Sequence, residues 1–182
     1  MKNNKIYYSY SMLSTFVRCP QKYKLVYIDH IRKKEEGIEA FAGKVVHEVL
    51  EWLYSSENIK KTIMLDQIIR KYNEIWLDRW HDKIMVYSKE NNFEKSNNIK
   101  AIKWKGGMDC LVNYSREYGP KFYEENQEGN IQNTLTIDNI KLEKKYIGRI
   151  ADYDFVGIMD RVNIGSEDVI IIDYKTTKKS AC

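Results

Sequence analysis

Residues 155–174, FVGIMDRVNIGSEDVIIIDY, contain two β-rich runs, FVGIMDRVN and DVIIIDY, separated by the short segment IGSE. Two such runs around a short Gly-containing loop are typical of a β-hairpin. If Ile164 pairs with Val169, then Asp160 lies directly opposite Asp173. Directly opposed residues point to the same face of a sheet, so the hairpin predicts two neighbouring carboxylates.

Lys175 lies two residues beyond Asp173 and is therefore expected on the same face. Adjacent carboxylates such as Asp160 and Asp173 repel each other unless a positive charge lies between them. Oxygen ligands suit Mg²⁺ or Mn²⁺, and Lys175 could orient or deprotonate a water beside the metal. These are the parts that phosphodiester hydrolysis requires.

The alternative is an ordinary ion pair at the surface, because a D-x-K pattern often recurs by chance. Two features favour the metal site. Asp173 follows Val169–Ile172, a run that is apolar on both faces and therefore predicts a buried strand. Asp160 interrupts the apolar run FVGIMDRV in the aligned position.

Helical periodicity dominates the chain before the hairpin. Apolar residues at spacings of three and four predict an amphipathic helix over residues 38–56 and a second over 62–82. A third is expected from about Ile102 to Tyr118, despite two internal glycines. Residues 88–99, SKENNFEKSNNI, are the most linker-like segment of the chain.

The two ends of the chain complete the expected architecture. Residues 8–30 predict a helix that is capped by Ser11 and is broken or restarted at Pro20. Residues 134–147 alternate apolar and polar side chains around an Asp138–Asn139 turn. The order is therefore helices first and a small antiparallel sheet afterwards, which indicates an α/β (α+β) fold.

Composition narrows the class of protein. The 182 residues contain no run of eighteen apolar residues, which excludes a transmembrane helix, and the polar N-terminus does not resemble a secretory signal. Three widely spaced cysteines argue against a disulfide framework and indicate a reducing compartment. The net charge of +4 permits a nucleic-acid partner without requiring one.

Four motifs in order resemble the RecB-like branch of the PD-(D/E)XK nuclease superfamily. Its helical G-x-x-x-H motif matches residues 43–47, GKVVH, and its first strand aspartate matches residues 157–160, GIMD. Its D-Y-K-[ST] motif matches residues 173–176, DYKT. The opening S-x-S-x-L…C-P-x-K-Y is similar to residues 8–27, YSYSMLSTFVRCPQKYKLVY. The resemblance implies a restriction-endonuclease-like core.

The resemblance also implies roles for individual residues. Catalytic roles fall to Asp160, Asp173 and Lys175. The metal ligands implied are His47, Asp160, Asp173 and the backbone carbonyl of Tyr174. Gly43 would let the histidine helix approach the sheet closely. Contacts with nucleic acid are implied for Arg161, Thr176 and Lys178. Taken by itself, a histidine on an amphipathic helix is more often structural, so that alternative for His47 stays open.

The sequence departs from this branch in two ways. A following Q-x-x-x-Y motif is not found, so we expect a single nuclease domain over residues 1–182, truncated at its C-terminus, with a helical insertion at 57–130. In AddB-type and CRISPR-associated members four cysteines hold an iron–sulfur cluster. Only Cys19 matches one of them, and one cysteine cannot hold a cluster, so we expect none in this chain.

The expected function is that of a metal-dependent DNA nuclease, a RecB-like or AddB-like exonuclease of DNA processing, recombination or repair. Mg²⁺ or Mn²⁺ is the expected cofactor. The expected partners are DNA, single-stranded or at duplex ends, and a helicase or another protein. The resemblance places such a chain in the cytoplasm of bacteria or archaea, or in a phage genome. The alternatives are a catalytically incomplete module that binds DNA or docks on a helicase, and a nuclease that processes RNA.

Overall fold

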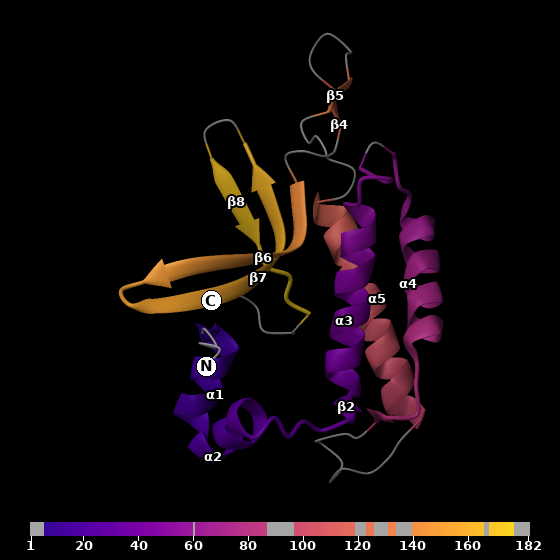
Figure 1. The fold of residues 1–182 in the computed structure, drawn as a ribbon. Helices are drawn as coiled ribbons and strands as arrows, with labels where there is room; N and C mark the ends of the chain where they lie inside the picture. The colour runs from indigo at the N-terminus through magenta and orange to yellow at the C-terminus, as the bar shows by residue number, and fades with distance from the viewer. Residues whose placement is uncertain are drawn as a thin grey trace. The chain divides into compact units, whose positions relative to one another are not determined.

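The computed structural model describes residues 6–59, 61–86, 97–118, 123–125, 131–133, 140–165 and 168–176 (Figure 1). The predicted Asp138–Asn139 turn, most of the predicted linker at 88–99, and Lys178 lie outside these residues. The chain divides into two compact units. One comprises Met1–Lys34 and Glu143–Met159, and the other comprises Glu35–Leu142 and Asp160–Cys182.

The first unit begins with a short strand that fixes the start of the following helix. Strand β1, Tyr7–Tyr8, pairs in parallel with the first half of β7, Tyr153–Ile164. This pairing keeps the chain extended up to Ser9, whose hydroxyl accepts a hydrogen bond from the backbone N–H of Met12 at 3.2 Å. The prediction that Ser11 caps the helix is therefore wrong, because Ser9 holds that position.

Short helices complete the described N-terminal segment. Helix α1 spans Tyr10–Arg18, α2 spans Pro20–Tyr23, and a π-helical turn, η1, spans Lys24–Ile28. Pro20 occupies the first turn of α2, where its missing N–H costs no intrahelical bond. The predicted restart of the helix at Pro20 is confirmed.

The second unit is built on three long helices that lie side by side (Figure 1). They are α3, Ile38–Leu53, α4, Leu65–Arg79, and α5, Asn97–Tyr118. Their apolar stripes form one hydrophobic core, in which the rings of Phe41 and Trp76 meet edge to face at 4.8 Å between centroids. All three helices predicted from periodicity are present.

Gly107 explains how α5 tolerates a glycine in its interior. A Cβ atom at this position would overlap the hydroxyl of Tyr72 on α4. That hydroxyl donates a hydrogen bond to the backbone carbonyl of Trp104 at 2.9 Å. The absence of a side chain thus lets a fully buried tyrosine reach the backbone of the neighbouring helix.

The main sheet is mixed. It contains β1, β6 (Ile140–Ile150), β7 and β8 (Val169–Ile172), with β7 as the neighbour of the other three. Two small pairs are β2 (Glu36–Gly37) with β3 (Ile84–Met85), and β4 (Tyr123–Glu125) with β5 (Ile131–Asn133). The parallel β1–β7 pair corrects the expectation of a purely antiparallel sheet, whereas the mixed α/β fold class is confirmed.

Strands β7 and β8 form the predicted hairpin with the predicted register. Ile164 pairs with Val169, and the ladder continues to Arg161 opposite Ile172. The prediction that β8 is buried is wrong, because Val169, Ile170 and Ile171 are all more than half exposed. An apolar run identifies a strand, but it does not identify what covers it.

Candidate metal and catalytic site

The site forms where the last strand ends beside helix α3. His47 lies on α3, one turn after Gly43, and Asp160 lies in the second half of β7. Tyr174 belongs to the irregular segment that follows β8. A Cβ atom on Gly43 would lie only 3.3 Å from the Thr176 hydroxyl, so the glycine allows this segment to pass close to the helix.

Three of the predicted metal ligands converge here. Nε2 of His47 lies 3.1 Å from the backbone carbonyl oxygen of Tyr174, and Nδ1 lies 3.5 Å from Oδ1 of Asp160. Oδ2 of Asp160 accepts a hydrogen bond from the backbone N–H of Tyr174 at 2.6 Å. The Asp160 side chain is only 13% exposed, so a largely buried carboxylate holds the backbone that presents the carbonyl.

The chemistry of these atoms fits a divalent cation. A carbonyl and a carboxylate both accept hydrogen bonds, whereas a neutral imidazole has only one N–H to donate. One nitrogen of His47 therefore presents its lone pair to an oxygen unless the ring is protonated or a cation lies nearby. Two oxygens and one imidazole nitrogen are ligands that Mn²⁺ and, less readily, Mg²⁺ accept.

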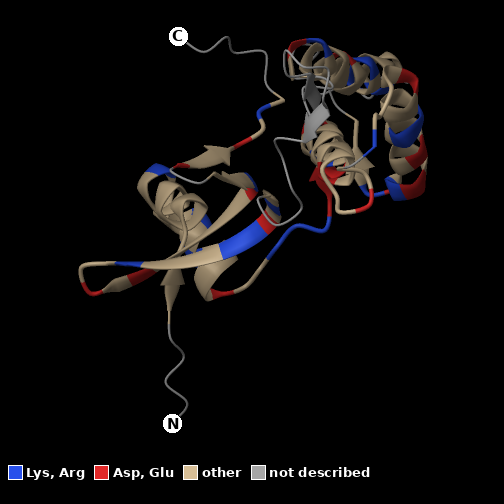
Figure 2. Cartoon of the chain, turned by 90° about the horizontal axis from the view of Figure 1, so that it is seen from above, with Lys and Arg blue, Asp and Glu red and all other residues tan. Residues whose placement is uncertain are grey.

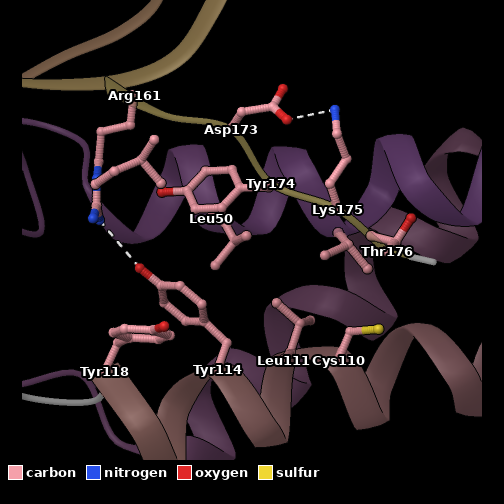
Figure 3. Close-up of a pocket in the computed structure, with 12 residues that line it drawn as sticks. Leu50, Cys110, Leu111, Tyr114, Tyr118, Arg161, Asp173, Tyr174, Lys175 and Thr176 are labelled. Atoms are coloured by element: carbon pink, nitrogen blue, oxygen red, sulfur yellow. Dashed lines mark hydrogen bonds and ion pairs between the residues drawn. The ribbon is translucent and has the colours of Figure 1, made fainter. Parts of the chain in front are cut away.

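Asp173 and Lys175 occupy a different position from the one the hairpin predicts. Because β8 ends at Ile172, Asp173 is not paired across the ladder with Asp160. Its Oδ2 lies 2.5 Å from Nζ of Lys175, and the two side chains are 60% and 72% exposed. Figure 3 shows the pair side by side, with the Tyr174 ring directed away from it.

The ion pair changes the electrostatics of Lys175. The hydrogen bond and charge of Asp173 raise the pKa of the Lys175 ammonium, and the charge of Asp160 adds a smaller effect in the same direction. Asp160 is thus close enough to influence Lys175. At neutral pH Lys175 is a cation, which favours contact with a phosphate over removal of a proton from water.

A pocket of about 390 Å³ adjoins this site (Figure 3). Its walls come from α3, α5 and the segment around Tyr174, and include Leu50, Leu111 and Tyr118. Thr176 and the Asp173–Lys175 pair also line it. Sequence reasoning did not find this pocket, because its walls come from residues more than a hundred positions apart.

Arg161 lies against the pocket and not on an open surface. It is 7% exposed, with its guanidinium carbon 3.8 Å from the centre of the Tyr54 ring. One guanidinium nitrogen donates to the Tyr114 hydroxyl at 3.1 Å, and the Tyr54 and Tyr114 hydroxyls are hydrogen-bonded to each other. Burial raises the pKa of Tyr114 and of Tyr174 to about 12, so both phenols stay neutral at pH 7.

The alternation of β7 could have indicated this environment. Asp160 and Arg161 are consecutive, so they point to opposite faces of the strand. If Asp160 faces His47, Arg161 must face away from it, among other side chains. Nothing in the sequence indicated that Tyr54 and Tyr114 are the residues that contact Arg161.

Cys19 lies in the first unit, exposed and without a disulfide. Its sulfur accepts a hydrogen bond from the backbone N–H of Lys22 at 3.4 Å and so caps α2. Basic and acidic residues both occur along α3, α4 and α5 (Figure 2), and Arg79 of α4 forms an ion pair with Glu48 of α3 at 2.7 Å.

Comparison with known proteins supplies one finding. A family model described as the PD-(D/E)XK nuclease superfamily matches residues 7–181. No curated protein and no solved structure matches the chain. Within the described residues, every helix is too short or too polar to cross a membrane.

Proposed function

The chain belongs to the PD-(D/E)XK nuclease superfamily, a family of metal-dependent phosphodiester hydrolases, and we propose that it is a RecB-like exonuclease that degrades DNA. The process served would be DNA processing, recombination or repair. The observation that carries the proposal is the convergence of His47, Asp160 and the Tyr174 carbonyl on one point.

These three groups would hold Mg²⁺ or Mn²⁺, with Asp173 as a further ligand. When bound, such a cation supplies Lewis-acid chemistry, because it polarises a phosphate oxygen and lowers the pKa of a water. Asp160 supplies the negative charge that attracts the cation and, through its hydrogen bond, holds Tyr174 in place. His47 adds a neutral ligand that favours Mn²⁺ over Mg²⁺.

Lys175 would act on the substrate. Its ammonium, protonated at neutral pH, can contact the scissile phosphate and orient the attacking water. Thr176, held against Gly43, lies next in the chain and can donate its hydroxyl to a phosphate oxygen. Lys178 would add a further contact with the nucleic-acid backbone.

Metal binding by the full chain tests this proposal. Asp160→Asn keeps the size of the side chain and an oxygen that can accept from Tyr174, but it removes the charge. We expect calorimetry to show Mn²⁺ affinity lowered by at least about tenfold, because a charged ligand is lost. Asp109→Asn, on the exposed side of α5, is the matched control and should leave Mn²⁺ binding unchanged. Equal Mn²⁺ affinity in Asp160→Asn and Asp109→Asn would disprove the ligand assignment.

A second candidate function is a catalytically incomplete nuclease fold that binds DNA or docks on a helicase. The observation that favours it is the exposed Asp173–Lys175 pair, in which two predicted catalytic groups neutralise each other. The two functions differ in one measurement. An active enzyme releases nucleotides from DNA in Mn²⁺ or Mg²⁺, whereas the binding module retains DNA without shortening it.

A further inference from the structure

Arg161 is a buried cation whose described neighbours offer no negative charge. Among the described residues no carboxylate forms an ion pair with Arg161, and its Nε has no hydrogen-bond partner. The groups around it are the neutral phenols of Tyr54 and Tyr114 and the ring of Tyr174. A buried ion without a counter-charge costs several kcal/mol, so a fold that keeps one has a use for it.

The space for a counter-ion lies beside it. Arg161 lines the pocket of about 390 Å³, a size ordinary for a small-molecule site. The lining carries two cations, Arg161 and Lys175, and one carboxylate, Asp173, whose charge Lys175 matches at 2.5 Å. Among the residues that line the pocket, the Arg161 guanidinium is therefore the charge without an opposite charge beside it. Such a pocket favours an anionic ligand.

The rest of the lining suits an aromatic group. Leu50, Leu111 and Tyr114 form an apolar and aromatic wall, and the half-exposed Tyr118 stands at the end of α5 (Figure 3). Bases stack on tyrosine rings, and guanidinium groups bind phosphate through paired N–H donors. A ligand with one phosphate and one flat ring matches both halves of the pocket.

We propose that this pocket binds a nucleoside 5′-monophosphate unit, with its phosphate on Arg161 and its base against Tyr118. The choice of a nucleotide over other aromatic phosphates rests on the proposed nuclease function. The binding itself does not, because Arg161 and Tyr118 are separate from the proposed metal ligands. The occupant would be one nucleotide of the bound strand or the released product.

Calorimetry on the full chain in EDTA tests this without metal or cleavage, using thymidine 5′-monophosphate, thymidine and inorganic phosphate as probes. We expect the monophosphate to bind more tightly than either of the others. Arg161→Gln should weaken binding of the monophosphate at least tenfold, because the charged hydrogen bond between the guanidinium and the phosphate is lost. Arg70→Gln, an exposed arginine on α4, is the control and should bind as the wild type does.

Cysteine protection gives a second measurement that needs no variant. Cys110 lines the pocket, and burial raises the pKa of its thiol, whereas Cys19 is exposed in the other unit. Under alkaline conditions, saturating thymidine 5′-monophosphate should slow alkylation of Cys110, read by peptide mass spectrometry, and leave Cys19 unchanged. Unchanged labelling of Cys110 would overturn the proposal.

The probes also separate the outcomes. Thymidine binding as tightly as its monophosphate would overturn the role of Arg161, and inorganic phosphate binding equally well would overturn the nucleotide assignment. If the wild-type chain bound thymidine 5′-monophosphate but no Mn²⁺, the proposed nuclease function would be disproved and the nucleotide pocket would stand. Mn²⁺-dependent cleavage of DNA by a chain that does not bind thymidine 5′-monophosphate would disprove the nucleotide pocket and leave the nuclease function standing.

Discussion

Replacing Arg161 with Met should separate stability from ligand binding. The substitution removes the cation–π contact with Tyr54, worth about 0.5–2 kcal/mol, and one hydrogen bond to Tyr114, worth about 1.5–3 kcal/mol. Against this it removes a buried guanidinium whose desolvation costs several kcal/mol. The Tyr54 and Tyr114 hydroxyls still bond to each other, so neither is left without a partner.

The free energy of unfolding should therefore stay the same or rise, by up to about 3 kcal/mol, because the relief of desolvation matches or exceeds the lost contacts. Urea denaturation in phosphate-free buffer measures it, and binding of thymidine 5′-monophosphate is measured on the same preparation. Arg70→Met, on the surface of α4, should change stability by no more than about 0.5 kcal/mol. A loss of 2 kcal/mol or more in Arg161→Met would refute the reasoning, since Arg161 would then be a structural residue.

Three further substitutions test separate parts of the structure. Lys175→Ala should lower the rate of DNA cleavage roughly 10²–10⁴-fold. The slope of log affinity for DNA against log salt concentration should fall by only about one. A cleavage rate as high as that of the control Lys105→Ala would exclude a catalytic role for Lys175. Gly107→Ala should lower the free energy of unfolding by about 1–3 kcal/mol, because the new methyl group would clash with the Tyr72 hydroxyl. In a double-mutant cycle the loss should be smaller when Tyr72→Phe has removed that hydroxyl. Additive effects of the two substitutions on the free energy of unfolding would contradict the close contact. Ile171→Lys should cost no more than about 0.5 kcal/mol, because the side chain is 57% exposed, and a large loss in thermal denaturation would show that β8 is covered.

The sequence predicted the hairpin because its register follows from short-range rules, whereas the meeting of His47 with Asp160 and the Tyr174 carbonyl was implied by the family resemblance. The Ile164–Val169 register follows from the loop length, and the register brings Asp160 near the end of the last strand. The motif around His47 placed it one turn after Gly43, the glycine that permits the close approach. The register uses a spacing that the chain itself contains, but the roles of His47 and Gly43 came from the resemblance.

The errors arose where the outcome depends on what lies next to an element. Asp173 was expected opposite Asp160, but the ladder stops at Ile172 and the chain turns toward α3. The burial of Arg161 between Tyr54 and Tyr114 was not predicted, because it depends on how α3 and α5 meet the strand, whereas its contact with nucleic acid stays a prediction. Periodicity reports which face of an element is apolar, but not which partner receives it.

Tyr174 belongs both to the proposed metal site and to the proposed nucleotide pocket. Its backbone N–H and carbonyl face Asp160 and His47, whereas its ring lines the pocket near Arg161. Asp173 and Lys175 form an ion pair with each other, and the Tyr174 ring points away from that pair (Figure 3). One residue therefore fixes both the carbonyl offered to a metal and one wall of the pocket. Tyr174 thus belongs to both places, through its backbone beside His47 and Asp160 and through its ring in the wall of the pocket, even though the proposed ligands differ.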